Sequence, residues 1–255
     1  MRRSSSGPWG IWATLGFSLI VVAAFLLVQV LISSTLVAIE LERNPSLDLE
    51  TYGQALASNG LLLALATIGG MLTTVALVGL FVHLRKDMGV SEYLHLHPIP
   101  SSTLVRWLGI MFALALLWDG VTYLFGRSVI PDFMLAAYQS AGFAPLLWLA
   151  LVVAAPLAEE VFFRGFLFEG VRHTRLGASG AVLFTSFAWA LVHVQYDSYE
   201  ISTVFVLGLI LGVARLRTNS LYTTIAMHAL VNLLATLEVA MYLQRASTSV
   251  SSAGV

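Results

Sequence analysis

The sequence contains no cysteine among its 255 residues. Disulfide bonds, thiolate metal ligands and a cysteine nucleophile are therefore all excluded. Charge is scarce as well, because Asp, Glu, Lys and Arg together make up only 11% of the chain, against about 25% in soluble domains. An ordinary soluble domain is excluded on this ground.

The chain also lacks an excess of basic residues. Its 13 Lys and Arg are set against 14 Asp and Glu, which gives a formal net charge of −1. Proteins that hold the phosphates of nucleic acids carry clustered positive charge. We therefore expect no nucleic acid partner.

Apolar residues, in contrast, make up 58% of the chain. They form runs of about 18 residues or more, which as helix are long enough to cross the hydrocarbon core of a bilayer. The fold class predicted is all-α, a polytopic transmembrane helical bundle of about seven spans in the lipid bilayer. The expected spans are 11–39, 56–84, 104–125, 143–170, 179–196, 201–216 and 221–242. A re-entrant piece within 127–142 would add an eighth.

The chain divides into three parts by content. Residues 1–142 hold the first three spans and no motif that we recognise, and 143–242 hold the four spans that carry ionisable residues. Residues 243–255 are rich in Ser and Thr, so we expect a disordered tail there.

Basic residues are unevenly divided between the two sides of the predicted bundle. Only Arg43, Arg127 and Arg245 fall on the side away from the N-terminus. Those on the side of the N-terminus are Arg2, Arg3, Arg85, Lys86, Arg106, Arg172, Arg175, Arg215 and Arg217. Because basic residues near span ends stay in the cytoplasm, the pattern predicts a multi-pass protein of the cell membrane with a cytoplasmic N-terminus.

Several polar residues lie inside the later spans. The segment APLAEEVFFRGFLF holds Glu159, Glu160 and Arg164, and two further segments hold His193 and the pair His228 and Asn232. A charge at the bilayer centre costs roughly 2.5–3.5 kcal/mol on insertion scales, so such residues are functional candidates.

Helix geometry separates their roles. Glu160 and Arg164 are four residues apart, which places them on one face as an ion pair. Glu159 is rotated by about 100° from Glu160 on a helix of 3.6 residues per turn, so it needs another partner. The histidines of the later spans are the candidates, and we expect the three helices to converge on one polar pocket.

Such a pocket has the groups needed to hydrolyse an amide bond. A carboxylate and an imidazole can deprotonate a water, and a second imidazole with an amide can donate to the oxyanion. A zinc site of one Glu and two His is the alternative, although no HExxH motif occurs. A serine nucleophile at Ser186 is weaker still, because no G-x-S-x-G motif occurs. Pro156 either kinks the helix beside Glu159 or marks an irregularity of packing.

Together, three motifs carry a resemblance to a known family. They are Glu159-Glu160-x-x-x-Arg164, an aromatic-x-x-x-His ending at His193, and His228-x-x-x-Asn232. This order resembles the CAAX-processing and bacteriocin-processing (Abi) membrane protease family, over residues 145 to 235.

That resemblance implies a metal-independent intramembrane glutamic endopeptidase whose substrate is a membrane-bound protein or peptide, prenylated CAAX proteins among them. Glu159 and His193 would activate water, His228 and Asn232 would form the oxyanion hole, and Glu160 and Arg164 would be the supporting pair. The family has phenylalanine where Trp189 stands, which puts substrate fit in doubt.

Two other functions remain open from the sequence. One is a non-catalytic bacteriocin-immunity or scaffold protein that keeps the pocket for binding or stability. The other is a proton-coupled transporter, since chains of Glu and His also relay protons, although no inverted repeat supports it.

Overall fold

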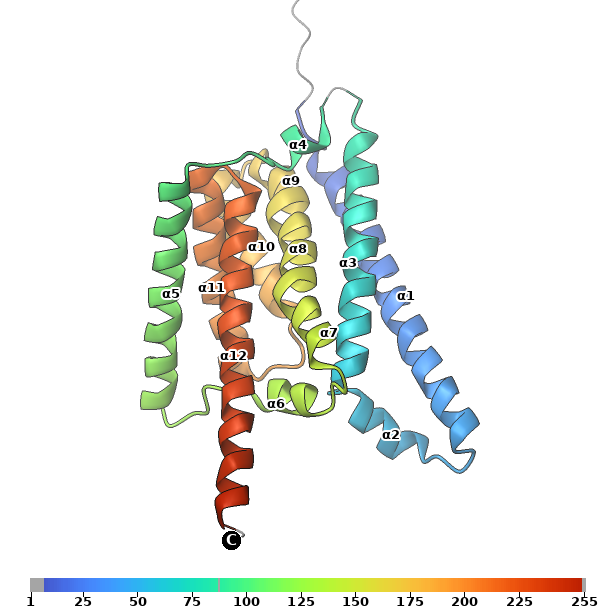
Figure 1. The fold of residues 1–255 in the computed structure, drawn as a ribbon. Coiled ribbons are helices and arrows are strands. Elements are labelled where there is room, and N and C mark those ends of the chain that lie inside the picture. The colour runs from blue at the N-terminus through green and yellow to red at the C-terminus, as the bar shows by residue number, and fades with distance from the viewer. Residues whose placement is uncertain (1–6, 87, 254–255) are drawn as a thin grey trace, which may run out of the picture.

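The computed structural model describes residues 7–86 and 88–253, and every regular element in that part of the chain is a helix (Figure 1). In chain order the elements are α1 (Ile11–Arg43), α2 (Leu49–Leu56), α3 (Gly60–His83), α4 (Val90–Tyr93), α5 (Ser101–Leu124), α6 (Asp132–Gln139), α7 (Ala144–Trp148), η1 (Leu149–Ala154), α8 (Ala155–Glu159), η2 (Glu160–Leu167), α9 (Phe168–Arg172), α10 (Gly177–Leu191), α11 (Ser198–Thr218) and α12 (Leu221–Ala253). Elements α7 to α9 follow one another without a break and form one long helix.

Six of these helices are long and apolar enough to cross a membrane. They are α1, α3, α5, the continuous helix Ala144–Arg172, α11, and α12 as far as Thr248. The fifth expected span, in contrast, is only the 15-residue α10, which at 1.5 Å per residue covers about 22 Å. The prediction of a polytopic helical bundle is confirmed. The helix of the fifth expected span ends at Leu191, so it does not include His193.

Residues 127–142, where a re-entrant piece would have added an eighth segment, contain no helix long enough to cross a membrane. That stretch contains the short helix α6, which lies at the end of the bundle where α5 finishes and α7 starts (Figure 1). An ion pair between Arg127 and Asp197 ties this connection to the start of α11, and Asp197 also caps α11 by accepting from the backbone of Glu200. The order of crossings after α5 is therefore unchanged.

Residues 243–255 were expected to form a disordered tail, and in the structure α12 continues past Tyr242 to Ala253. Hydroxyl groups in this part of α12 are hydrogen bonded within the helix. Ser247 donates to the carbonyl of Gln244 at 2.8 Å, and Thr248 donates to that of Arg245 at 2.9 Å. Residues 254–255 lie outside the described part of the chain.

The continuous helix α7 to α9 forms the centre of the bundle, with α3, α10 and α12 packed around it (Figure 1). Residues 160–171 are all buried, so this part of the helix is surrounded by protein, whereas Leu149 and Val153 nearer its start are exposed. Close packing of α11 on α10 depends on Gly208 and Gly212. A Cβ at Gly212 would lie 2.9 Å from a methyl of Val182, and one at Gly208 would lie 2.9 Å from Ser186. The GxxxG spacing therefore serves packing.

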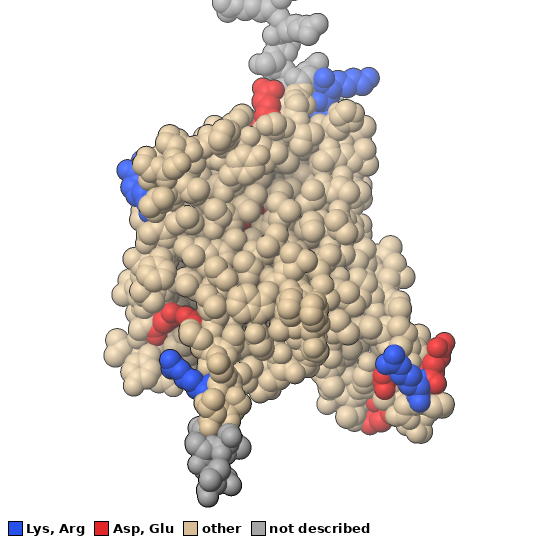
Figure 2. All heavy atoms as spheres, in the orientation of Figure 1, with Lys and Arg blue, Asp and Glu red and all other residues tan. Residues whose placement is uncertain are grey.

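Charged side chains gather at the two ends of the molecule, and the surface between them is almost entirely uncharged on the face drawn in Figure 2. Exposed apolar side chains such as Leu26, Leu117 and Phe187 cover the sides of the bundle. Such a band is the surface that a protein presents to lipid. The chain is a multi-pass membrane protein on these grounds.

The two ends differ in charge. The end where α3 finishes and α5 begins, which we call the basic end, carries Arg85, Lys86, Arg106, Arg172, Arg175 and Arg217, whereas the opposite end carries Arg43, Arg127 and Arg245. Arg2 and Arg3, which also entered the orientation prediction, lie outside the described residues.

We expect the basic end to face the cytoplasm, because basic residues near span ends are retained there. The absence of cysteine allows a direct test with single substitutions. In intact cells a membrane-impermeant maleimide should label Glu50→Cys, on α2 at the opposite end, and should label Arg175→Cys only after permeabilisation. The parent chain is the unlabelled control, and the reverse pattern would contradict the orientation.

Candidate active site

The centre of the long helix departs from α-helical geometry on either side of Glu159. Segment η1 is π-helical, so the N–H of residue 155 bonds the carbonyl of Ala150, five residues back. In the same register the next bond would run from the N–H of residue 156 to the carbonyl of Leu151, but residue 156 is proline and has no N–H. The carbonyl of Leu151 is thereby left free, and the side-chain amide of Asn232 donates to it at 2.8 Å. Pro156 thus determines where Asn232 sits.

Glu160 and Arg164 form the ion pair expected from their spacing. The distance from Arg164 Nη1 to Glu160 Oε1 is 3.0 Å, and both side chains are fully buried. Arg164 also donates through Nη2 to the carbonyl of Gly208 at 3.3 Å. The same Glu160 oxygen contacts His228 Nδ1 at 3.0 Å. Glu160 therefore contacts His228 as well as Arg164. The four-residue spacing of Glu160 and Arg164 did not indicate the contact with His228.

Trp189 connects the remaining polar groups. Its indole N–H donates to Glu159 Oε2, and the guanidinium of Arg164 lies over its ring, 4.4 Å from the centroid. The rings of His193 and His228 both meet it edge-on, each with centroids 5.2 Å apart. Trp189 is 1% exposed. The residue that departs from the family pattern is therefore in direct contact with the candidate carboxylate.

His193 lies two residues beyond the end of α10, in a loop and not within a span as expected. Its Nδ1 is 2.8 Å from the carbonyl of Trp189. Because a carbonyl can only accept, Nδ1 carries the hydrogen, and Nε2 of the neutral ring is left with its lone pair. The geometry thus makes Nε2 of His193 a proton acceptor.

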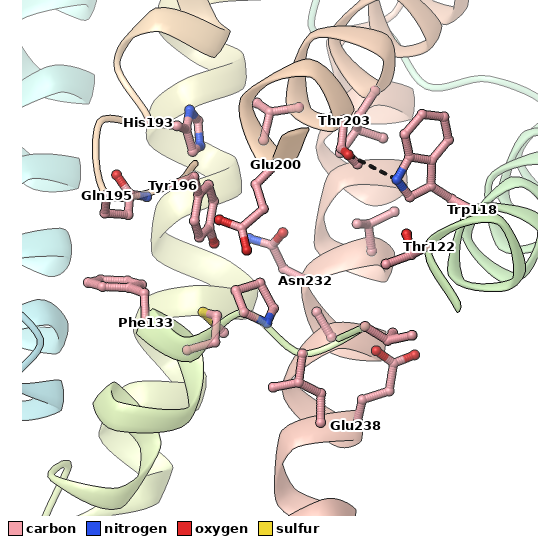
Figure 3. A pocket seen from close by; sticks show the side chains of 18 of the residues that line it. Trp118, Thr122, Phe133, His193, Gln195, Tyr196, Glu200, Thr203, Asn232 and Glu238 are labelled. Carbon is pink, nitrogen blue, oxygen red and sulfur yellow. Dashed lines mark hydrogen bonds between the residues drawn. The ribbon is translucent and has the colours of Figure 1, made fainter. Parts of the chain in front are cut away.

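A cavity of about 660 Å³ lies beside these groups. Glu159, His193, His228 and Asn232, the four side chains proposed for catalysis, all line it. Figure 3 shows His193, Tyr196, Glu200 and Asn232 around the same hollow, with Phe133 from α6 and Glu238 from α12 further along it. The cavity extends toward the end of the bundle opposite the basic end, where the loops after α5 and α10 lie.

The cavity also contains residues that the sequence did not indicate. Tyr196 stacks on His193 with ring centroids 5.9 Å apart. Desolvation raises the pKa of the Tyr196 phenol to about 12, and the carboxylates of Glu200 and Glu159 contribute to the shift. The phenol therefore remains protonated at neutral pH and is a hydrogen-bond donor at the cavity wall.

Other chemistries suggested by the sequence find less support in the geometry. Ser186 is fully buried and is not among the residues that line the cavity. In the described part of the chain, no three His, Asp or Glu side chains are grouped as metal ligands.

Comparison with known proteins finds a family to which this part of the chain is similar. Residues 141–234 match the family model described as type II CAAX prenyl endopeptidase Rce1-like. This segment of the chain is similar to that family. It begins just before α7 and contains Glu159, Trp189, His193, His228 and Asn232, whereas Phe133 and Glu238 of the cavity lie outside it.

A curated relative of the chain is the "Uncharacterized 24.3 kDa protein" of Escherichia coli, which is 32% identical over 114 residues. The match covers 42% of this chain and 46% of the relative, so the chain spans about half of that protein's length. No solved structure matched the chain.

A second buried polar cluster joins residues of the 141–234 segment to His95. Glu169, 2% exposed, accepts from Arg215 Nη2 at 2.9 Å and lies 3.2 Å from both Arg172 Nη1 and His95 Nε2. Arg215 was expected to be one of the basic residues of the N-terminal side, yet it is fully buried and donates through Nε to the carbonyl of Arg164 at 3.1 Å. This cluster connects the basic end of the bundle to the backbone of η2.

Arg164→Ala should destabilise the protein more than Glu159→Ala, because it leaves Glu160 buried without its guanidinium. Breaking a buried ion pair on one side costs roughly 3–5 kcal/mol. Glu159 is partly exposed to the cavity, so its loss leaves no buried charge unpaired. Thermal unfolding of the purified variants in one detergent measures the difference, and equal shifts of the unfolding temperature would contradict this division of roles.

Proposed function

We propose that the protein is a CAAX-type intramembrane endopeptidase that hydrolyses a peptide bond of a membrane-bound protein or peptide. Its Rce1-like segment supports a protease activity of this kind. The observation that carries the proposal is the position of Glu159. Arg164 is committed to Glu160, so the Glu159 carboxylate is left facing a cavity large enough for a peptide and water.

In the proposed reaction, Glu159 and His193 activate the attacking water. The carboxylate is an acceptor whose orientation is fixed by the indole N–H of Trp189. Nε2 of His193 offers a second acceptor from the loop after α10. Two acceptors around one water favour removal of its proton and direct its lone pair at the substrate carbonyl.

The developing oxyanion would be stabilised by His228 and Asn232. One amide hydrogen of Asn232 goes to Leu151, and an amide NH₂ has a second hydrogen to donate. Nδ1 of His228 contacts the Glu160 carboxylate, which can only accept, so Nδ1 carries a hydrogen. The proposal requires that Nε2 also carry a hydrogen when it donates to the oxyanion.

The steps balance without a covalent intermediate. Glu159 takes a proton from water, and the hydroxide forms a bond to the carbonyl carbon. Collapse of the tetrahedral intermediate breaks the C–N bond, and the proton held by Glu159 passes to the leaving amine. The second water hydrogen, left on the new carboxylic acid, then passes to the amine, so the products are a carboxylate and an ammonium, and the carboxylate of Glu159 is restored.

Glu159→Ala and His193→Ala should be nearly inactive, because each removes an acceptor for the water proton. Asn232→Ala should lose about 10²–10³-fold in turnover, as expected for one oxyanion donor. The measurement is cleavage of a panel of membrane-bound and lipidated peptides, prenylated CAAX peptides included, by the purified full chain. Thr67→Val, which changes another residue of the cavity lining, is the matched control. Parent-like turnover by Glu159→Ala would contradict the mechanism.

Activity should also survive strong chelation, because Glu159 and His193 act on the water directly. A site of one Glu and two His around zinc would lose its metal and its activity together. Turnover measured with and without a chelator distinguishes the two. Loss of activity that added zinc restores would favour the metal site, even if cleavage itself were established.

A further inference from the structure

A second cavity lies between the ends of α5 and α11 at the basic end of the bundle. Its volume is about 470 Å³. The residues that line it are Thr103, Arg106, Trp107, Ile110, Val213, Arg217 and Thr218. None of them lines the cavity of the candidate active site, so this is a separate feature.

The cavity exists because α5 and α11 are joined at their other ends. Trp118 Nε1 donates to Thr203 Oγ1 at 2.9 Å, and the hydroxyls of Thr122 and Tyr199 are 2.8 Å apart. Near Arg106 and Arg217, in the described part of the chain, no hydrogen bond or ion pair joins the two helices. The helices are therefore held together at one end and leave a groove at the other.

Two exposed arginines lie on the walls of this groove, one from each helix. Arg106 is in the second turn of α5, and Arg217 is in the last turn of α11. The lining contains no Asp or Glu, and in the described chain neither guanidinium has an ion-pair partner. Guanidinium groups bind phosphate oxygens in pairs of hydrogen bonds, so the groove favours a phosphate.

The apolar part of the lining indicates which class of phosphate compound the groove favours. Ile110 is four residues after Arg106, and Val213 is four residues before Arg217, so each aliphatic side chain lies on the same helix face as an arginine, one turn further into the bilayer. Trp107 lies at the level of Arg106, where tryptophan marks the interface of membrane and water. The groove is therefore charged at the interface and apolar below it.

We propose that this cavity binds an anionic phospholipid, with its phosphate between Arg106 and Arg217 and its acyl chains over Ile110 and Val213. Basic pockets between transmembrane helices recognise anionic headgroups in this way. A soluble phosphorylated compound would use the arginines but leave the aliphatic part of the groove without a ligand.

Native mass spectrometry of the delipidated full chain in neutral detergent tests the site. The probes are phosphatidylglycerol and phosphatidylcholine with the same acyl chains. Phosphatidylglycerol should form the tighter one-to-one adduct. Arg106→Gln and Arg217→Gln should each weaken it by about fivefold, the contribution of one basic residue near an anionic surface. Equal retention of the two lipids would overturn the proposal.

Two further variants separate the cavity from general attraction to the basic end. Arg175→Gln removes the same charge from an exposed position outside the cavity and should leave binding unchanged. Val213→Trp keeps both arginines but fills the groove, and it should abolish the preference for phosphatidylglycerol. A loss in Arg175→Gln equal to that in Arg106→Gln, or parent-like binding by Val213→Trp, would overturn the assignment.

A final arm distinguishes lipid from soluble phosphate. Glycerol phosphate, the headgroup without acyl chains, should fail to displace bound phosphatidylglycerol at equal concentration. Full displacement would identify a soluble phosphate site instead and overturn the lipid assignment.

Discussion

The shared carboxylate of Glu160 is the interaction on which the rest of the site depends. One of its oxygens is 3.0 Å from Arg164 and 3.0 Å from His228, and both charged groups of the ion pair are fully buried. A buried ion in a membrane protein is tolerated only when it is paired and hydrogen bonded. Satisfying that requirement holds His228 of α12 against the central helix, at a position where it lines the cavity. The contacts that stabilise the buried Glu160 thus also position His228, a proposed catalytic group.

The same argument explains why two adjacent glutamates have different surroundings. Glu160 points into protein and is neutralised by a cation, whereas Glu159 contacts an indole N–H and the cavity. Trp189 separates them, because Arg164 covers the face of the ring while Glu159 accepts from its nitrogen. A phenylalanine at this position could hold the guanidinium by its π-face but could not donate to Glu159. The tryptophan of this chain therefore adds a hydrogen bond that an unsubstituted aromatic ring lacks.

The sequence predicted the parts of this site that depend on helical periodicity. The Glu160–Arg164 pair followed from a spacing of four residues, and the division of labour with Glu159 followed from a rotation of about 100° per residue. The features of the site that the sequence could not predict arise where the chain departs from that periodicity or where distant residues meet. The π-helical register moves the free carbonyl from residue 152, expected for an α-helix with Pro156, to Leu151. Glu169 and Arg215 meet across 46 positions of sequence, and no local pattern reports such a contact.

The shortness of α10 gives the last step in this argument. At about 22 Å it falls short of a hydrocarbon core of about 30 Å, so the chain must cover the difference as a loop. Irregular backbone at that depth is stable only where protein or water satisfies its polar groups. The loop after Leu191 meets this condition, since His193 and Tyr196 both line the cavity and His193 bonds the carbonyl of Trp189. A full-length span would have placed residue 193 on a helix with its backbone satisfied internally. The incomplete helix instead brings a histidine and a tyrosine to the cavity that Glu159 also lines.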